Sequence, residues 1–327
     1  MSEALDELLE FTRPGAWPER RAGRFASRLV DTHADPDPLA ALRDPVLAGA
    51  GHGFRGIGLI GLADDEGVRL NGGRPGARQG PDAFRTALAA YGGAHSVGLH
   101  GLPVPVLDLG NVEPGRSLGE THERVSATVA SAIRLDLMPI GIGGGHDLTY
   151  PEVRAVIDTL IRPSGRSLHG IYFDAHLDVR EEEGSGMPFR RLLDYGGVER
   201  LSLFGFDPLS NTPAHLDWFF AHGGEFADFP ADDWPRSPAQ FVSICLDVVD
   251  MAQAPGVSAP APAGWMAQRV ADYAEAAGRD PAVCCFDLME LSPPHDESGR
   301  TARLAAHLFL RFLSGLKDRA RHRDGAS

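Results

Sequence analysis

Short apolar runs that stop at polar, reactive residues recur along the chain, and helical stretches separate them. The runs are residues 56–62, 104–108, 138–142, 170–173, 201–204, 241–244 and 283–286. Between two of them, Val125, Val129 and Ile133 are spaced to share one face of a helix over 118–137. Further helices are expected at 151–161, 266–278 and 300–316. Strands that are apolar on both faces are typical of a mostly parallel sheet covered by helices on each side.

This alternation predicts a single α/β domain of three layers, α/β/α. We find no internal repeat and no low-complexity linker that would divide the chain. Residues 1–55 carry many charges and prolines with little periodicity, so we expect a peripheral N-terminal arm. The main domain is expected over 56–320, followed by a short tail over 321–327.

Composition limits the partners that the chain can have. The net charge is −14 over 327 residues, which argues against nucleic acid or an anionic membrane as a partner. Three cysteines, two of them adjacent, make no disulfide framework and indicate a reducing compartment. The polar start of the chain does not resemble a signal peptide, and no apolar run approaches a membrane span. We therefore expect a cytoplasmic protein that acts on a small molecule.

Four segments at the ends of apolar runs carry the residues that could do chemistry. They are Gly143-Gly144-Gly145-His146-Asp147, Asp174-Ala175-His176-Leu177-Asp178, the stretch 243–250 with Cys245, Asp247 and Asp250, and Asp287-Leu288-Met289-Glu290. In open parallel sheets, ligands bind beyond the carboxyl ends of the strands. The position of these segments therefore predicts one shared site.

The Asp-x-His-x-Asp segment indicates a metal site most strongly. Its charged groups repel each other unless a cation holds them, although an ordinary solvated loop is an alternative, as a turn is for His146. Together the segments supply two histidines and at least four carboxylates. That donor set suits Mn²⁺, and the low thiol number argues against structural zinc. There are enough ligands for two ions, which could hold and deprotonate one water between them.

In their order and spacing, these segments resemble the three signatures of the ureohydrolases, the family of arginases, agmatinases and formimidoylglutamases. Segments 76–85, 254–260 and 290–293 also resemble family elements, and the resemblance runs from about residue 56 to 316. It implies an arginase-like fold, two Mn²⁺ ions per chain and assembly into a trimer or hexamer. The metal ligands that it implies are His146, Asp174, His176, Asp178 and Asp247.

The resemblance also implies catalytic roles. Asp178 would orient the bridging hydroxide, and Glu290 would hold the amidine or guanidine nitrogens of the substrate. A buried acid paired with a core arginine is the alternative for Glu290. His176 would complete the shell of the second ion.

Cys245 departs from the family pattern, because most members carry a metal-ligating Asp at this position. A thiolate can ligate a divalent ion, so we keep Cys245 in the predicted ligand set. A thiolate nevertheless bridges two Mn²⁺ ions less favourably than a carboxylate does. The consequence could be a weaker second metal, a softer metal preference or loss of activity. An inactive binding protein with the ureohydrolase fold is therefore one alternative.

The loop after Asp178 predicts the substrate. Arg180 and Phe189 stand where arginases place an Asn and a proton-shuttling His. Arg180 suits a substrate carboxylate, and with Ser185 and Arg190 it forms the predicted substrate-binding set. This loop resembles that of the formimidoylglutamases of histidine degradation, although Met187 differs from their usual Thr.

We therefore expect hydrolysis of N-formimino-L-glutamate to L-glutamate and formamide. An agmatinase- or arginase-like guanidino hydrolase is the alternative within the enzyme class. Arg180 counts against agmatine, because that substrate has a cationic amine tail.

Overall fold

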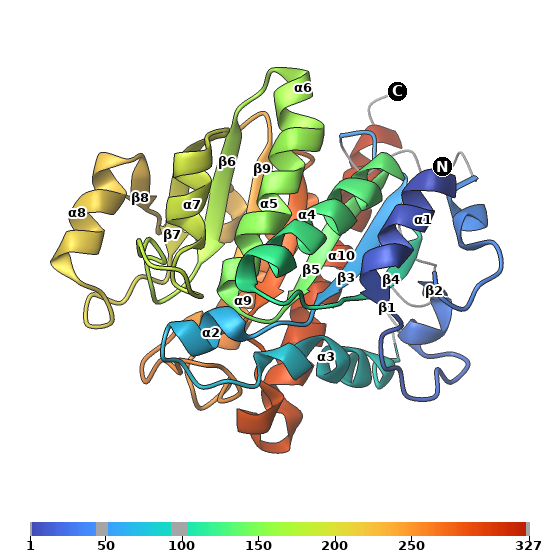
Figure 1. Cartoon of the computed structure of the whole chain (residues 1–327), viewed down its shortest axis with the longest axis horizontal. Coiled ribbons are helices and arrows are strands. Elements are labelled where there is room, and N and C mark those ends of the chain that lie inside the picture. Colours follow the sequence, from blue (N-terminus) through green and yellow to red (C-terminus); the bar gives the residue numbers. More distant parts are fainter. Residues whose placement is uncertain (1, 44–51, 93–103, 325–327) are drawn as a thin grey trace.

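The computed structural model describes residues 2–43, 52–92 and 104–324, which form one ten-stranded sheet between two layers of helices (Figure 1). The strands are β1 (Thr12–Arg13), β2 (Val30–Asp31), β3 (Gly56–Leu62), β4 (Val106–Val112), β5 (Leu137–Gly143), β6 (Leu168–Phe173), β7 (Val198–Phe204), β8 (Gly224–Phe226), β9 (Gln240–Cys245) and β10 (Val283–Met289). Their order is β1-β4-β3-β5-β10-β9-β6-β7-β8, and β2 also pairs with β4. Only the β1–β4 pair is antiparallel among the described strands, so the predicted, mostly parallel sheet is confirmed.

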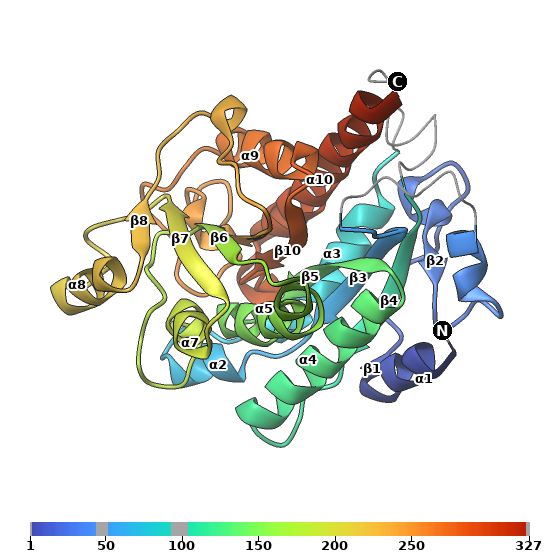
Figure 2. The ribbon, with the colours of Figure 1, turned by 90° about the horizontal axis from the view of Figure 1, so that it is seen from above.

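Two groups of helices cover the two faces of the sheet (Figures 1 and 2). One face carries α1 (Ser2–Phe11), α4 (Leu118–Arg134), α5 (Thr149–Val156) and α7 (Pro188–Tyr195). The other face carries α3 (Gly80–Ala89), α9 (Ala267–Arg279) and α10 (Arg300–Asp324). Of the shorter helices, α2 (Glu66–Leu70) follows β3, α6 (Arg162–Ser164) continues α5, and α8 (Pro213–Ala221) lies beside the edge strand β8. No helix of the described residues is long and apolar enough to cross a membrane.

The central strands are buried because helices cover both of their faces. Every residue of β3, β5, β9 and β10 is buried. The segment predicted as an N-terminal arm takes part in this packing, since α1 packs on α4 and both β1 and β2 pair with β4. The predicted tail over 321–327 begins inside α10, and residues 325–327 lie outside the described part.

The strand order brings the four polar segments together. Strands β5, β10, β9 and β6 are consecutive neighbours in the sheet, and each one ends at a predicted site segment. Because these strands are parallel, their carboxyl ends meet at the same edge. The topology alone therefore places His146, Asp174, Asp247 and Glu290 around one point.

Candidate metal centre

The side chains of the four segments form two overlapping groups of potential metal ligands. Ligand atoms of His146, Asp174 and Cys245 lie within 4.8 Å of one another, as do those of Asp174, His176 and Asp247. Asp174 belongs to both groups: its Oδ1 accepts from the backbone N–H of His176 at 2.6 Å, and its Oδ2 lies 2.9 Å from Nδ1 of His146. The two oxygens of Asp174 thus connect two sites, as a carboxylate bridging two ions would.

Asp178 joins the first group. Its Oδ2 lies 2.9 Å from Nδ1 of His146, and its side chain is 13% exposed, facing the pocket. The backbone of Asp178 has a φ of 50°, in the left-handed region that a non-glycine residue rarely adopts. Glu290 has a φ of 70°. Such backbone strain is concentrated at functional sites, where the surrounding structure holds it in place.

Hydrogen bonds behind His146 fix which of its nitrogens carries the proton. The Ser243 hydroxyl donates to Oδ1 of Asp287 at 2.6 Å, and Thr149 donates to the other oxygen of Asp287 at 2.9 Å. The oxygen of Ser243 also lies 3.0 Å from Nε2 of His146. Because the hydroxyl hydrogen is already used, Nε2–H of the imidazole is the donor in this contact. Nδ1 is then left with a lone pair that points at Asp174 and Asp178.

This arrangement fits a cation. Nδ1 of His146, Oδ2 of Asp174 and Oδ1 of Asp247 are buried atoms without a hydrogen-bond partner in the described structure. Electron-rich atoms that face each other in a buried site repel unless positive charge lies between them. The donors are imidazole nitrogen, carboxylate oxygen and one sulfur, a set that holds divalent transition-metal ions.

The pKa values of the two histidines reflect the same demand for positive charge. Burial lowers the pKa of His146, but the carboxylates of Asp174 and Asp178, each with an oxygen 2.9 Å from Nδ1, outweigh it and raise that pKa well above its ordinary value. For His176, burial is again outweighed, here by Asp247 and Asp174, and the pKa rises to about 12. The cluster therefore stabilises positive charge at both groups of ligands.

Glu290 is held from two sides. Its Oε1 accepts from the backbone N–H of His146 at 2.8 Å, and its Oε2 accepts from the Ser258 hydroxyl. Burial raises the pKa of Glu290 to about 8, with the charge of Asp247 acting in the same direction and Ser258 against it. Glu290 does not pair with a core arginine among the described residues, which removes the alternative considered for it.

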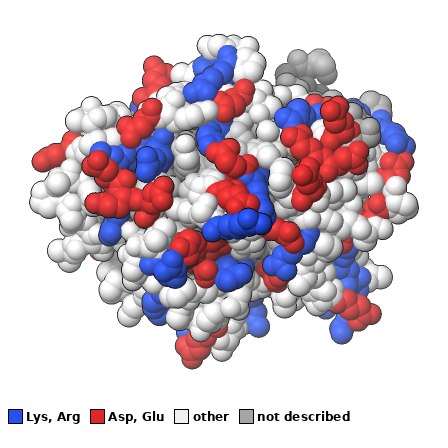
Figure 3. Space-filling model, in the orientation of Figure 1, with Lys and Arg blue, Asp and Glu red and all other residues white. Residues whose placement is uncertain are grey.

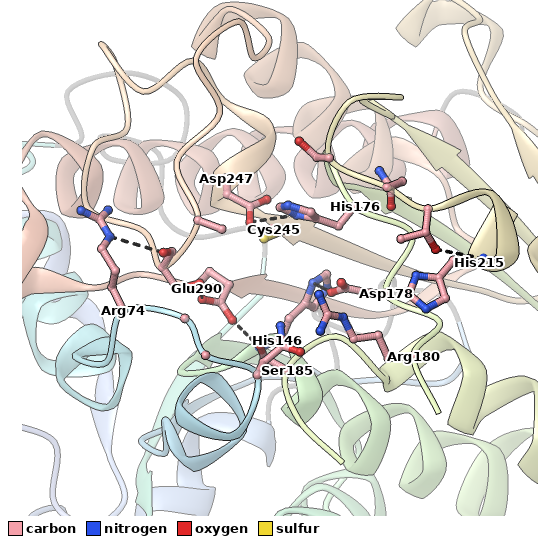
Figure 4. Close-up of a pocket in the computed structure, with 18 residues that line it drawn as sticks. Arg74, His146, His176, Asp178, Arg180, Ser185, His215, Cys245, Asp247 and Glu290 are labelled. Atoms are coloured by element: carbon pink, nitrogen blue, oxygen red, sulfur yellow. Dashed lines mark hydrogen bonds and ion pairs between the residues drawn. The ribbon is translucent and has the colours of Figure 1, made fainter. Parts of the chain in front are cut away.

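A cavity of about 310 Å³ opens over the two groups of ligands (Figure 4). Of the predicted residues, His146, His176, Asp178, Arg180, Ser185, Cys245, Asp247 and Glu290 line it, while Asp174 lies fully buried beneath. Arg190 is not among the lining residues: its guanidinium lies 3.2 Å from Glu181 and over the ring of Trp218. Phe189 is also outside the cavity and packs edge-on against the ring of His146.

Several lining residues were not predicted from the sequence. Arg74 enters from the side opposite Arg180 and bonds the backbone carbonyls of Val257 and Ser258. The loop before α8 contributes Ser210, Asn211 and Thr212, and α8 itself contributes His215. Arg74 stands two residues before Gly76, where the motif segment 76–85 begins, and this nearness is the one feature of the sequence that could have pointed to it. The loop residues belong to no motif and come into place only through folding.

Comparisons with known proteins agree with this geometry. The sequence model of the arginase family matches residues 55–315. Formimidoylglutamase of Nocardia farcinica is 36% identical over 276 residues, covering 78% of this chain and 85% of that protein. The crystal structure of Trypanosoma cruzi formiminoglutamase with Mn²⁺ is similar with a TM-score of 0.72 and 28% identity, covering 85% of this chain and 97% of that one. Formimidoylglutamase from Bacillus subtilis shares the fold with a TM-score of 0.76 at 24% identity, covering 93% and 95%.

Proposed function

This chain belongs to the arginase family, and on that premise we propose that it hydrolyses the formimino C–N bond of N-formimino-L-glutamate. The products are L-glutamate and formamide, and the reaction belongs to histidine degradation. The observation that carries the proposal is the pair of ligand groups joined by Asp174, beneath a cavity lined by Arg180, whose guanidinium no other described residue pairs with. The curated relatives named formimidoylglutamase support the same substrate.

The cofactor is a pair of Mn²⁺ ions. His146, Asp174, Asp178 and Cys245 would hold one ion, and Asp174, His176 and Asp247 the other. When bound, the ions supply positive charge and lower the pKa of a bound water, so that this water can lose a proton near neutral pH. The hydrogen bond from Nε2 of His146 to Ser243 keeps Nδ1 directed at this site.

Glu290 and Asp178 act on the reacting groups. The carboxylate of Glu290 lies beside the first ligand group and accepts a hydrogen bond from the formimino N–H, which favours the cationic, more electrophilic form of the substrate. Asp178 orients the attacking water by accepting one of its hydrogens. The water oxygen adds to the formimino carbon. The bond from that carbon to the glutamate nitrogen then breaks. The nitrogen leaves with the proton that Asp178 took from the water, and the added hydroxyl loses its proton to solvent as the carbonyl of formamide forms.

Arg180 and Ser185 bind the glutamate part. Arg180 presents its guanidinium at the cavity mouth, where a substrate carboxylate can accept two parallel N–H bonds. The Ser185 hydroxyl, on the same loop, provides a further donor. A cationic amine tail, as in agmatine, would meet Arg180 with like charge.

A comparison of substrates tests the proposal. The Mn²⁺-loaded protein is assayed with N-formimino-L-glutamate, agmatine and L-arginine, while bound metal is counted by elemental analysis. We expect glutamate and formamide from the first substrate only, with two ions per chain. Turnover of agmatine or arginine instead would contradict the assignment, and so would two bound ions without any turnover.

We further propose that the chain works in the cytoplasm as a homo-oligomer, a trimer or a hexamer. The family resemblance supports the assembly, and the three free cysteines support a reducing compartment. Light scattering on the eluting protein during gel filtration measures the assembly directly. A mass of one 35.0 kDa chain would contradict it.

A further inference from the structure

Cys245 differs from the other two cysteines in the surroundings of its sulfur. Cys284 donates its S–H to the carbonyl of Gln240 at 3.2 Å, and Cys285 donates to Oε1 of Glu152 at 3.5 Å, so both have a partner in the core. Cys245 is 1% exposed, yet its side chain lines the cavity. Its Sγ lies among potential ligand atoms, within 4.8 Å of those of His146 and Asp174.

The polar atoms around the sulfur of Cys245 are suited to bind a cation. Nδ1 of His146 and Oδ2 of Asp174 are both buried and lie 2.9 Å apart, but this contact lacks hydrogen-bond geometry, and neither atom has another hydrogen-bond partner in the described structure. The two residues are 1% and 0% exposed. This second observation distinguishes Cys245 from an ordinary buried thiol, because its neighbours are unsatisfied donors to a metal and not apolar side chains.

A thiolate has one donor atom, whereas a carboxylate has two oxygens that can each face a different ion. Asp174 directs one oxygen at His176 and the other at His146, so it serves both ligand groups. Cys245 has a single donor atom; it lies beside Asp247, but the set of ligand atoms within 4.8 Å of one another to which it belongs is the one with His146 and Asp174. The two groups therefore differ in chemistry: the first offers nitrogen, oxygen and sulfur, and the second only nitrogen and oxygen.

We infer that the centre holds two unlike metal sites. The site formed by His146, Asp174 and Cys245 is sulfur-ligated and prefers softer divalent ions, such as Co²⁺, Zn²⁺ or Cd²⁺, more strongly than an all-carboxylate site would. The site formed by Asp174, His176 and Asp247 lacks sulfur and keeps the preference for Mn²⁺. The inference rests on the proposed function only in using the same two-ion centre, and it does not depend on the substrate.

Cobalt binding to the metal-free full chain tests the sulfur ligand without any assay of activity. A cysteine sulfur bound to Co²⁺ gives an intense charge-transfer band in the near ultraviolet. We expect this band in the wild type, saturating at one Co²⁺ per chain although two bind. It should persist in Cys284→Ser, a buried thiol outside the cavity, and be lost in Cys245→Ser and Cys245→Asp. Two bound Co²⁺ without the band in the wild type, or a band that survives in Cys245→Ser, would overturn the inference.

Competition between Cd²⁺ and Mn²⁺ provides a second measurement, which does not require the variant Cys245→Ser to fold. The number of Mn²⁺ ions displaced by Cd²⁺ is followed in the wild type and in Cys245→Asp, which restores an oxygen ligand. We expect the Cd²⁺ concentration that displaces one Mn²⁺ from the wild type to be lower, by about tenfold or more, than the concentration that displaces one Mn²⁺ from Cys245→Asp. Equal displacement from the two proteins would overturn the inference.

The results separate this inference from the proposed function. A charge-transfer band without turnover of N-formimino-L-glutamate would support the sulfur site and contradict the substrate. Turnover with two ions but no band would support the substrate and contradict the sulfur site.

Discussion

Arg180 presents a guanidinium that its own protein leaves available. No hydrogen bond or ion pair ties that guanidinium within the described part of the chain, although Glu181, Glu182 and Glu183 follow it directly. The side chain lies over Gly186, where an added Cβ would come within 2.9 Å of Cδ and 3.1 Å of Nε. The absence of a side chain at Gly186 thus allows Arg180 to lie along the cavity wall.

Replacing Arg180 by Gln should weaken substrate binding. Loss of a charge-assisted, two-pronged hydrogen bond costs about 1.5–3 kcal/mol, so kcat/KM for N-formimino-L-glutamate should fall about 10- to 100-fold, mainly through KM. Steady-state kinetics measure this. Arg191→Gln is the matched control, because that arginine lies in α7, directly after the loop, and contacts Met187 instead of the cavity. An equal effect of both variants would contradict the role of Arg180.

Asn211 holds the backbone on both sides of His176. Its amide nitrogen donates to the carbonyl of Ala175 at 2.8 Å, and its amide oxygen accepts from the N–H of Leu177 at 2.9 Å. A third bond from the same nitrogen reaches the carbonyl of Asp207 at 2.8 Å. All three bonds fix the position of a metal ligand that Asn211 does not itself touch.

The variant Asn211→Ala should therefore weaken binding of the ion at His176. Loss of outer partners of a ligand typically lowers metal affinity by roughly 10- to 100-fold. Titration with limiting Mn²⁺ should show one ion bound almost as in the wild type and the other more weakly. Ser210→Ala, which removes only a bond to Asp207 in the same loop, is the control. Unchanged affinity for both ions would contradict a positioning role for Asn211.

Among the elements, the connection between α4 and β5 contains avoidable strain. Asp136 follows the end of α4 with a φ of 59°, and its N–H bonds the carbonyl of Ile133 as the chain leaves the helix. Glycine is the preferred residue at such a position because it has no Cβ to clash. Asp136 precedes β5, whereas the site lies beyond the carboxyl end of that strand, and Asp136 is not among the residues that line the cavity.

We expect Asp136→Gly to stabilise the fold. Relief of the left-handed strain outweighs the greater freedom of glycine in the unfolded chain, for a net gain of roughly 0.5–1 kcal/mol in the free energy of unfolding. Urea unfolding gives the value as a shift of the midpoint to higher concentration. A midpoint that is unchanged or lower would show that Asp136 makes a compensating interaction.

In the β6–β7 pair, the surroundings of His169 keep its imidazole neutral. Its Nε2 lies 2.8 Å from the Ser202 hydroxyl, which donates to Glu225, and Arg200 donates to its Nδ1 at 3.2 Å. Burial, and next the charge of Arg200, lower the pKa of His169 to about 4. In the unfolded chain the pKa returns to its ordinary value near 6.5.

Stability should therefore fall in acid because of this residue. Above pH 6.5 His169 is neutral in both states, and its contribution is fully present. As the pH falls from 6.5 to 4, His169 binds a proton in the unfolded state but not in the folded state. The free energy of unfolding therefore falls by roughly 3 kcal/mol. The difference in unfolding free energy between wild type and His169→Gln should change over this range. A pH-independent difference would contradict the account.

Seven of the ten described strands could be predicted from the sequence because each is an apolar run long enough to cross a covered sheet. The other three, β1, β2 and β8, are only two or three residues long and show no such run. The short helices α3, α7 and α8 could not. The first begins with Gly80-Pro81, a pair that also indicates a turn, although proline is favoured at the first helical position. Helix α8 buries only Phe219, so it shows no amphipathic period.

The same distinction applies to the site. Residues that directly follow strands, such as His146 and Glu290, could be placed together from the sequence, because parallel strands end at one edge. Arg74 and Asn211 lie in loops whose approach to the cavity depends on the whole fold. Arg190 was predicted to bind substrate, but its pairing with Glu181 depends on how the loop folds, and the geometry does not bring it to the cavity.

For the whole molecule, the net charge of −14 must be reconciled with an anionic substrate. On the face seen in Figure 3, acidic and basic side chains are interspersed and form no single basic patch. Attraction for a dicarboxylate is therefore local, from Arg180 and Arg74 at the cavity (Figure 4). The overall charge disfavours nucleic acid, whereas binding of a small anion needs positive charge only at the cavity.

The central claim is that two ions lie at the joined ends of β5, β6 and β9. X-ray data collected at the manganese absorption edge from crystals of the Mn²⁺-loaded protein test it most directly. The account predicts two anomalous peaks on either side of Asp174, one beside His146 and Cys245 and one beside His176 and Asp247. A single peak, or no peak among these residues, would contradict it.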